Sequence, residues 1–578
     1  MKDEVDKIPF AESYSKTHNS VKSNKDDLTR FASPTRNHEA ACSGNCISKD
    51  SIVVTSKDSK HDRAELQQLH KRHRNTLDEG RSEAAAKRHN KGYRTARENL
   101  SDLCDEGSFI EYGQLAVAAQ RGRIEEQELR TSTAADGVIT GTATINSELY
   151  PENCDVAVII NDYSVLAGSQ GFFHHHKLDR ILTVAKEQQL PVLMFTEGGG
   201  GRPGDTDVTT QIAGLNILSF ALWAGLSGVV PRIAVANGYC FAGNAALFGC
   251  ADITIATQTS WIGMAGPAMI EGGGLGIFKP TEIGPIEVQS KNGVVDIVVK
   301  DEAEATAMAK KVLGVFQGSI AEWGCADQST LQHLLPEDRR YAYPVRNIIN
   351  AIADTGSFIE LREKDGRGIV TGFIRIEGKP LGLIANDCKV LGGAIDSDAS
   401  EKAARFMQLC NAYSIPLVSL CDTPGFMVGP RNEEAAAVRR MSRLFVAGAA
   451  ITVPLVTIFL RKGYGLGAMA MAGGSFAKPS YSAAWPTGEF GGMGLEGAVT
   501  LGFKKELDAE QDPVAKKELF NKLVEEMYDL GKATEAASFL EIDAVIDPSH
   551  TRKVIAKAIK AASKKMQPRP ERRFVDTW

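Results

Sequence analysis

The chain lacks the features that would mark a membrane or secreted protein. None of its apolar runs approaches the roughly 20 residues of a transmembrane helix. Its first residues, MKDEVDKIPF, mix charges without an apolar core, so we expect no secretory signal. The net charge of −6 gives no reason to expect nucleic acid or an anionic membrane as partner. The length of 578 residues allows two or three domains with full cores.

Paired cysteines are scarce. Eight of the ten cysteines stand singly, several inside apolar stretches, as Cys240 and Cys421 do. This is typical of reduced thiols in a cytoplasmic protein without disulfides. The one close pair, Cys42 and Cys46, lies within residues 1–60, which we expect to be a disordered or loosely held polar tail. A zinc site needs four ligands and no second pair stands at a useful spacing, so we predict no metal.

Common catalytic and nucleotide-binding motifs are missing as well. No Ser-His-Asp or Cys-His set can be assembled. The tetraglycine of residues 198–201 has neither the Lys-Ser/Thr of a Walker loop nor the spacing of a dinucleotide fingerprint. Four glycines in a row still bring the backbone close to something, and we favour a ligand over turn chemistry. Residues 174–176, three histidines, point in different directions on a helix and are interpreted as a polar helix start.

One stretch, PRIAVANGYCFAGNAALFG at residues 231–249, combines a strand, a turn and a helix start. Residues 233–235 suit a buried strand, and the small residues 242–246 open a helix. A tight turn into a helix leaves backbone N–H groups free for a phosphate or a negatively charged oxygen. The alternative is a tightly packed strand–helix unit whose small residues only permit close approach.

This stretch occurs twice. Residues 454–472, PLVTIFLRKGYGLGAMAMA, repeat it, and further pairs of segments match in the same order. The pairs are residues 105–111 with 354–360, 161–162 with 386–387, 166–168 with 391–393, 190–200 with 415–425, and Trp261 with Trp485. Chance does not supply such an ordered series, so we predict two homologous α/β domains.

The predicted division is a tail at residues 1–60, an N-terminal domain at 61–335 and a C-terminal domain at 336–578, with the polar segment 326–343 as boundary. Strands are predicted at residues 136–145, 156–162, 191–195, 233–235 and 251–256. Helices are predicted at residues 62–103, 174–189, 213–223, 515–536, 550–565 and 301–317, the last with Asp301 as N-cap and Glu304 at the capping-box position.

These motifs resemble the carboxyltransferase (β) subunits of the biotin-dependent acyl-CoA carboxylases, the group of the propionyl-CoA and methylcrotonyl-CoA enzymes. The matching segments lie within about residues 66–575: HNKGYRTARENLSDLCDEGSFIE, DGVITG, NDYSVLAGSQG, CDTPGFMVG, VPLVTIFLRKGYGLGAM and AWPTGEFGGMG. The resemblance implies two crotonase-like (ClpP/crotonase) domains related by internal duplication. It also implies a hexamer, a trimer of dimers, with each active site between the first domain of one subunit and the second domain of another.

The resemblance further implies carboxyl transfer from carboxybiotin on a separate carrier protein to the α-carbon of an acyl-CoA. Two enolates would form, each held by main-chain donors, and biotin itself would take the α-proton. Carried over by position, the catalytic donors would be the N–H groups of Gly243, Asn244, Leu466 and Gly467. The acyl-CoA side would comprise Gly198, Gly199, Gly200, Gly201, Ala242 and Gly266. The biotin side would comprise Asp422, Thr423, Pro424, Gly425, Phe426, Tyr464, Gly465, Trp485 and Gly488.

Some positions depart from the propionyl-CoA type. That type has Gly-Gly where this chain has Gly243-Asn244 and Leu466-Gly467, so a side chain at Asn244 or Leu466 would narrow the pocket or add contacts. Met469 falls where the family places a residue that tunes acyl-chain size, and its apolar side chain indicates an acyl group other than the smallest. The segment TEGGGGRPGD is also unlike that type.

The chain has no Met-Lys-Met biotin-attachment site and no ATP-grasp glycine loop. It would therefore work with a separate biotin carboxylase and a biotin carboxyl carrier protein, or with one subunit that combines both. Three alternatives remain open: a biotin-dependent acyl-CoA decarboxylase subunit of the same fold, a crotonase-like hydratase or isomerase, and a non-catalytic hexameric scaffold. A hydratase needs a glutamate acid/base pair, for which Glu271 is the only weak candidate.

Overall fold

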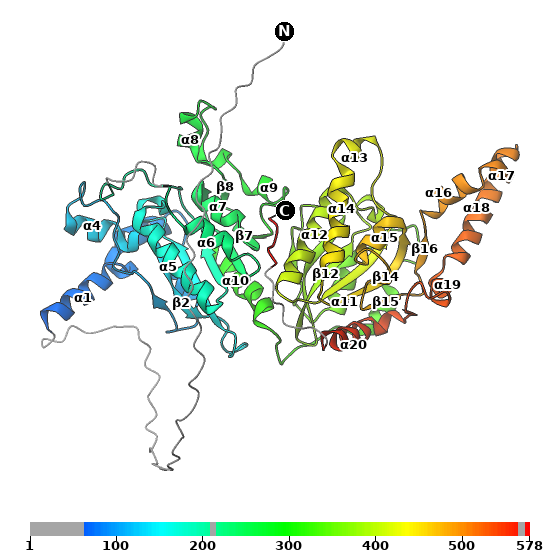
Figure 1. Ribbon diagram of the computed structural model, residues 1–578, viewed down its shortest axis with the longest axis horizontal. Helices are drawn as coiled ribbons and strands as arrows, with labels where there is room; N and C mark the ends of the chain where they lie inside the picture. Colours follow the sequence, from blue (N-terminus) through cyan, green and yellow to red (C-terminus); the bar gives the residue numbers. More distant parts are fainter. Residues whose placement is uncertain (1–62, 209–214, 565–572, 578) are drawn as a thin grey trace, which may run out of the picture. The chain divides into compact units, whose positions relative to one another are not determined.

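The computed structural model describes residues 63–208, 215–564 and 573–577 (Figure 1). The predicted tail and the Cys42–Cys46 pair lie outside these residues. The described chain is a mixed α/β structure built on two large sheets and one small one. No helix in the described part is long and apolar enough to cross a bilayer.

The first large sheet belongs to the N-terminal half. Its strand order is β1-β2-β3-β4-β5-β7-β9, with antiparallel pairing up to β3 and parallel pairing from there on. The parallel strands are buried almost throughout, which explains their continuous apolar runs. The bounds are β1 Ile110–Glu111, β2 Val138–Thr144, β3 Asp155–Asn161, β4 Val192–Phe195, β5 Arg232–Ala236, β7 Ile253–Thr257 and β9 Ile297–Val299.

The second large sheet has the same plan. Its order is β10-β11-β12-β13-β14-β15-β17, again antiparallel up to the third strand and then parallel, with β16 paired to the end of β14. A two-stranded sheet of β6 Tyr239–Phe241 and β8 Trp261–Gly263 occupies the corresponding place in the first half. The remaining bounds are β10 Ile359–Leu361, β11 Ile369–Ile376, β12 Lys379–Asn386, β13 Leu417–Thr423, β14 Leu455–Tyr464, β15 Tyr481–Ala484, β16 Glu489–Gly491 and β17 Ala544–Val545.

Helices cover both sheets. In the first half they are α1 Ala64–Arg74, α2 Ser82–His89, α3 Ala96–Leu103, α4 Glu126–Ser132, α5 Phe172–Gln188, α6 Ser219–Gly225, α7 Gly243–Gly249, α8 Pro267–Gly272, α9 Ile286–Gln289 and α10 Glu302–Gln317. In the second half they are α11 Val345–Ile352, α12 Ser397–Ala412, α13 Pro430–Glu434, α14 Ala437–Ala450, α15 Gly465–Met471, α16 Leu495–Gly502, α17 Lys504–Ala509, α18 Pro513–Leu530, α19 Ala533–Ser538 and α20 Thr551–Ser563.

Strand alternation assigns the core side chains to separate layers. Met194 and Trp223 lie in the core formed with α5, α6 and α7, whereas Phe195 faces a larger core that also contains Phe373 and Phe406 of the second half. The two halves therefore share one apolar layer. Helices α16–α18 form an arm with a small core of their own, built around Val499, Leu507 and Leu523 (Figure 1).

Several sequence predictions need correction. The single helix expected at residues 62–103 is three helices, because Gly92 adopts φ +79° after α2 and Thr95 starts α3 with a capping box to Glu98. The helix expected at residues 213–223 begins only at Ser219. Asp301 does cap α10, but the Glu304 carboxylate accepts from the Lys300 N–H, so the box is not formed.

The triple histidine does open a helix, α5, yet it is not simply polar surface. His174 is fully buried beside the Asp136 carbonyl, and the His175 imidazole contacts the Ser219 hydroxyl at 3.0 Å. Burial lowers the pKa of both imidazoles. They are therefore neutral packing groups between α5 and its neighbours.

Candidate active site

The turn between β6 and α7 places free donors at the start of a helix. Ala242 has φ 53° and ψ −120°, a conformation that costs a residue with a Cβ about 1–3 kcal/mol. Its own N–H donates to the Gly263 carbonyl, and its carbonyl accepts from Ala246. Among the described residues no acceptor takes the N–H groups of Gly243 or Asn244. The predicted donors of the first half are thus available.

The Asn244 side chain adds contacts and does not narrow a pocket. It is fully buried, and its Nδ2 donates to the carbonyls of Gly168 and Thr196, each at 3.3 Å. A Cβ on Gly198 would collide with this amide. Asn244 therefore fills the space behind the glycine loop and ties the loop to α7.

The tetraglycine lies directly against this turn. Gly198 pairs with β6 through two main-chain hydrogen bonds, and Gly199 donates to the Ala167 carbonyl. Gly200 has φ +88°, and a Cβ there would lie 2.6 Å from the Ala242 Cβ. Gly201 has open space around it. The loop approaches the turn so closely that only glycine fits at Gly200.

Two further residues, Gln170 and Gly266, pack around the turn that carries Gly243. Gln170 is 4% exposed, its side-chain oxygen lies where a Gly243 Cβ would point, and its Nε2 has no acceptor among the described residues. Gly266, the N-cap of α8, lies against the Phe241 ring: a Cβ added to Gly266 would be 3.5 Å from the nearest ring carbon. The structure thus brings the predicted acyl-CoA residues together around one turn.

The second half repeats this arrangement at α15. Gly465 takes φ +56°, close to the value at Ala242, and no acceptor among the described residues takes the N–H groups of Leu466 or Gly467. A Cβ on Gly467 would lie 2.7 Å from the Cα of Gly425 and 3.0 Å from the N of Phe426. The loop after β13 therefore packs main chain to main chain on α15, whereas the tetraglycine meets the side chains of Ala242 and Asn244 at α7.

Not every predicted biotin-side residue faces this surface. Tyr464 is 2% exposed, and Trp485 is 1% exposed with its indole N–H donated to the Thr551 hydroxyl at 2.8 Å. Gly488 packs within 3.1 Å of Ala484 and Ala533, measured from its virtual Cβ. These three support the site from inside, which corrects the expectation that Trp485 lines it. Thr423 and Gly425 are also buried, whereas Pro424 and Phe426 are half-buried.

Two side chains of α15 reach the surface. Leu466 is 61% exposed and Met469 is 36% exposed, so both lie on the outer face of the helix. Leu466 therefore neither fills the space beneath the turn nor blocks its own N–H. Its exposure is the reverse of the burial of Asn244 at the matching turn.

A buried carboxylate precedes each loop. Glu197 accepts two hydrogen bonds from the Arg88 guanidinium, at 2.9 and 2.7 Å, and burial raises its pKa to about 7. Asp422 is fully buried and accepts from the Tyr343 hydroxyl at 2.8 Å and from Arg461 at 3.0 Å. Asp422 was expected on the biotin side, but its carboxylate faces inward. Sequence reasoning missed Glu197 and Arg88. The repeat gave a signal for Glu197, because it aligns Glu197, just after β4, with Asp422 near the end of β13.

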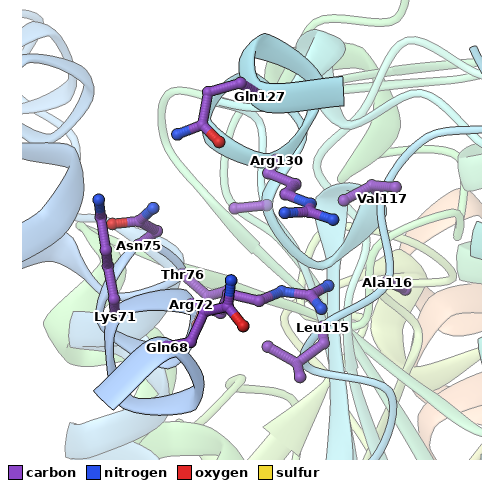
Figure 2. Close-up of a pocket in the computed structure, with 11 residues that line it drawn as sticks. Gln68, Lys71, Arg72, Asn75, Thr76, Leu115, Ala116, Val117, Gln127 and Arg130 are labelled. Atoms are coloured by element: carbon purple, nitrogen blue, oxygen red, sulfur yellow. The ribbon is translucent and has the colours of Figure 1, made fainter. Parts of the chain in front are cut away.

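Two cavities open on the first half away from Gly243. One, of about 100 Å³, lies between α1 and α4, with Lys71 and Arg72 from α1 and Arg130 from α4 around it (Figure 2). The other, of about 280 Å³, is lined by residues of α2 together with Glu197 and Tyr239. No group of three or more potential metal ligands occurs in the described part of the chain.

A protein-family model matches most of the chain. The model described as "Carboxyl transferase domain" matches residues 87–575, and the chain belongs to that family. The methylmalonyl-CoA carboxyltransferase 12S subunit of Propionibacterium freudenreichii subsp. shermanii is 32% identical over 496 residues, 84% of this chain and 92% of that protein. The propionyl-CoA carboxylase beta chain of Saccharopolyspora erythraea is 31% identical over 533 residues, 88% and 94% of the two chains.

Solved structures of carboxylases and a transcarboxylase are similar to this chain as well. A single-chain, multi-domain long-chain acyl-CoA carboxylase superposes with a TM-score of 0.82 at 53% identity over 86% of this chain. This chain covers 49% of that protein, so it spans about half its length. The transcarboxylase 12S structure gives a TM-score of 0.77 at 30% identity, over 90% of this chain and all of that one. The predicted family, and its carboxyl-transfer activity within biotin-dependent acyl-CoA carboxylases, are confirmed.

Proposed function

We propose that this chain transfers a carboxyl group between carboxybiotin on a separate carrier protein and the α-carbon of an acyl-CoA. The observation that carries the proposal is the pair of equivalent turns, at Ala242–Gly243 and Gly465–Gly467, each with free N–H groups and each covered by a loop that follows a parallel strand. Carboxyl transfer forms two enolates, and two donor sites match that need.

In the first half the chain binds and polarises the thioester. The N–H groups of Gly243 and Asn244 would donate to its oxygen as negative charge develops there. Asn244 and Gly198 hold this turn and the glycine loop in one rigid unit, so the donors need little reorganisation during the reaction. Removal of one such donor costs about 10²–10³ in kcat in other enzymes.

In the second half the residues fit a biotin ureido group. Its oxygen needs two N–H donors, and Leu466 and Gly467 present them beside the half-buried Pro424 and Phe426. When bound there, carboxybiotin would supply the carboxyl group, and its biotin ring would supply the base for the α-proton. The chain's own part is to orient the ring and stabilise its oxygen, which explains why no catalytic Ser, His or Cys set is needed.

We further infer that the two halves are crotonase-like domains derived by internal duplication, divided near residues 326–343. The matching strand orders support this, as do the equal backbone angles at equivalent positions: φ is 48° at both Leu166 and Leu391. A hexamer with active sites shared between subunits is the corresponding proposal for assembly. The transcarboxylase 12S title describes hexamer assembly for that protein.

The substrate proposal is an acyl group longer than acetyl. Met469 presents an apolar side chain at the surface of α15, and the neighbour with 53% identity is described as a long-chain acyl-CoA carboxylase. A competition assay with acetyl-, propionyl-, methylcrotonyl- and longer acyl-CoAs and carboxylated carrier tests this. The proposal requires a higher kcat/KM for one of the longer substrates. Preference for acetyl-CoA would contradict the substrate proposal, and no transfer to any acyl-CoA would contradict the reaction.

The decarboxylase alternative uses the same site in reverse. Carboxyl flow from a carboxylated acyl-CoA to carrier biotin, without the forward reaction under matched concentrations, would favour it. This alternative is supported by similarity to the methylmalonyl-CoA decarboxylase subunit alpha of Veillonella parvula, which is 30% identical over 85% of this chain.

A further inference from the structure

Gln170 carries a buried carboxamide whose nitrogen has no partner. The residue is 4% exposed, and its Nε2 donates to no acceptor among the described residues. The carbonyl oxygen of the same amide lies against Gly243, in the space that a Cβ there would need. The side chain of Gln170 therefore ends at the turn that carries the free N–H groups of the first half.

The main chain of Gln170 is fixed to the glycine loop. Its N–H donates to the Gly200 carbonyl at 2.7 Å, and its carbonyl accepts from the Arg202 N–H at 2.8 Å. Gln170 and Gly201 form a parallel bridge as a result. The carboxamide is thus held between the loop and α7.

The second half has the same main-chain bonds with an apolar side chain. The repeat aligns Ile395 with Gln170. The Ile395 N–H donates to the Gly425 carbonyl at 3.0 Å, and the Ile395 carbonyl accepts from the Met427 N–H at 2.8 Å. Ile395 is fully buried in the core that the two halves share. This position therefore does not need an amide to hold its loop.

The unpaired amide has no structural explanation. A buried polar group without a hydrogen bond destabilises the folded state, and nearly all such groups in native proteins are paired. An isoleucine at the equivalent position would avoid that cost. A ligand that accepts a hydrogen bond at Gly243 accounts for the glutamine.

The carboxamide can turn a donor toward such a ligand. A half-turn about its last side-chain bond exchanges the oxygen and the nitrogen, and this torsion is roughly two-fold. Its N–H group would then lie beside those of Gly243 and Asn244. The half-buried Phe220 ring also borders the turn, 3.2 Å from a Cβ added to Gly243. Hydrogen bonds are stronger in such partly apolar surroundings than in water.

We propose that Gln170 is a catalytic residue that donates its side-chain N–H to the thioester oxygen of the acyl-CoA, as a third donor beside the N–H groups of Gly243 and Asn244. The inference rests on the proposed function, because it adds a donor to the same site. When the α-proton passes to the base on the biotin side, the electron pair of the C–H bond moves onto the thioester oxygen. A third donor stabilises that negative charge, and no bond to Gln170 forms or breaks.

The kinetic test is Gln170→Met, because methionine is similar in length and unbranched but has no donor. In the complete enzyme with its carboxylated carrier, kcat should fall about 100-fold, and KM for acyl-CoA should change by no more than about fivefold. Thr457→Val is the matched control: the Thr457 hydroxyl is also buried and unpaired, but it lies near the start of β14. The control should change neither value. An unchanged kcat in Gln170→Met, or an equal loss in Thr457→Val, would overturn the assignment.

A thermal melt of both variants separates the loss of a donor from damage to the fold. Each substitution removes an unpaired buried polar group, so the melting temperature should stay the same or rise. A loss of kcat in Gln170→Met that comes with a lower melting temperature would assign Gln170 a packing role and refute the proposal.

A second variant, Gln170→Glu, restores a donor only in acid. The introduced carboxyl group can donate when it is protonated, and it repels the negative thioester oxygen when it is ionised. The ratio of its kcat to that of Gln170→Met at the same pH should therefore rise as the pH falls. A ratio that does not depend on pH would contradict the donor role.

A binding test without turnover keeps this inference separate from the reaction. The probes are an acyl-CoA and the matching S-alkyl-CoA thioether, in which CH2 replaces the carbonyl group. In calorimetry without carrier, Gln170→Met should bind the acyl-CoA about fivefold more weakly and the thioether with unchanged affinity. Equal weakening for both probes would overturn the inference. Absence of carboxyl transfer to any acyl-CoA in the unmodified protein, with the binding difference present, would contradict the proposed reaction alone.

Discussion

The close approach of Gly200 to Ala242 gives the sharpest prediction, because Gly249, an exposed glycine at the far end of α7, supplies a matched control. Gly200→Ala would place a Cβ 2.6 Å from the Ala242 Cβ at a residue with φ +88°. The left-handed backbone costs about 1–3 kcal/mol, and the overlap a further 1–3 kcal/mol unless the loop moves. A Cβ in Gly249→Ala meets nothing within 4 Å, and Gly249 does not have a left-handed φ, so this substitution carries no comparable cost.

The loop can relieve this strain by moving away from the turn. Such movement would break the hydrogen bond from the Gln170 N–H to the Gly200 carbonyl and that from Gly199 to Ala167, each contributing about 1 kcal/mol. We therefore expect local displacement and not global unfolding. In Gly200→Ala the acyl-CoA turn should lose its cover, with kcat/KM for acyl-CoA reduced about 100-fold, as for loss of one donor.

The assay is acyl-CoA-dependent carboxyl transfer with carboxylated carrier, together with a thermal melt of each variant. Gly249→Ala should keep kcat/KM within about threefold of the unmodified enzyme, below the 1.4 kcal/mol that a factor of ten represents. Equal losses in both variants, or full activity in Gly200→Ala, would refute the argument that close approach of this loop sets the site.

Three further predictions concern the two turns and the buried carboxylate. Gly467→Ala should lower transfer from carboxylated carrier about 100-fold without changing KM for acyl-CoA, whereas Gly497→Ala, with open space, should do neither. Ala242→Gly should raise the free energy of unfolding by about 1 kcal/mol, measured by denaturant titration, because it relieves the strained φ of 53°; a loss would contradict the strain. The pKa of Glu197 is raised to about 7, so its protonated form favours the folded state. This group's stabilisation is complete below about pH 4.5 and is lost as pH rises through 7, by about 3 kcal/mol. Glu197→Gln should reduce the fall in the free energy of unfolding between about pH 4.5 and pH 7. If that fall is unchanged in the variant, other groups cause the pH dependence.

Much of the fold follows from local signals in the chain. Apolar runs locate β3, β4, β5 and β7 to within about two residues, because a strand covered on both faces has to be apolar throughout. The side-chain oxygen of Asp301 caps α10 as predicted, since that interaction is local. Helix ends did not follow from the periodicity at residues 62–103, where a break after Arg74 with the short 3-10 helix Asp78–Arg81, and a turn at Gly92, divide the segment.

The ordered repeat, the glycines beside it and the family motifs are legible in the sequence alone, and they determine the class of reaction. They consist of residue types whose backbone preferences hold wherever the chain carries them. Only the tertiary structure decides which way each side chain at the turns faces. In the two matching turns Asn244 is buried, whereas Leu466, which corresponds to Gly243, is exposed. Trp485 packs inside, and Arg88 contacts Glu197 from a distant helix. Those outcomes depend on neighbours far along the chain, whose packing no local pattern encodes.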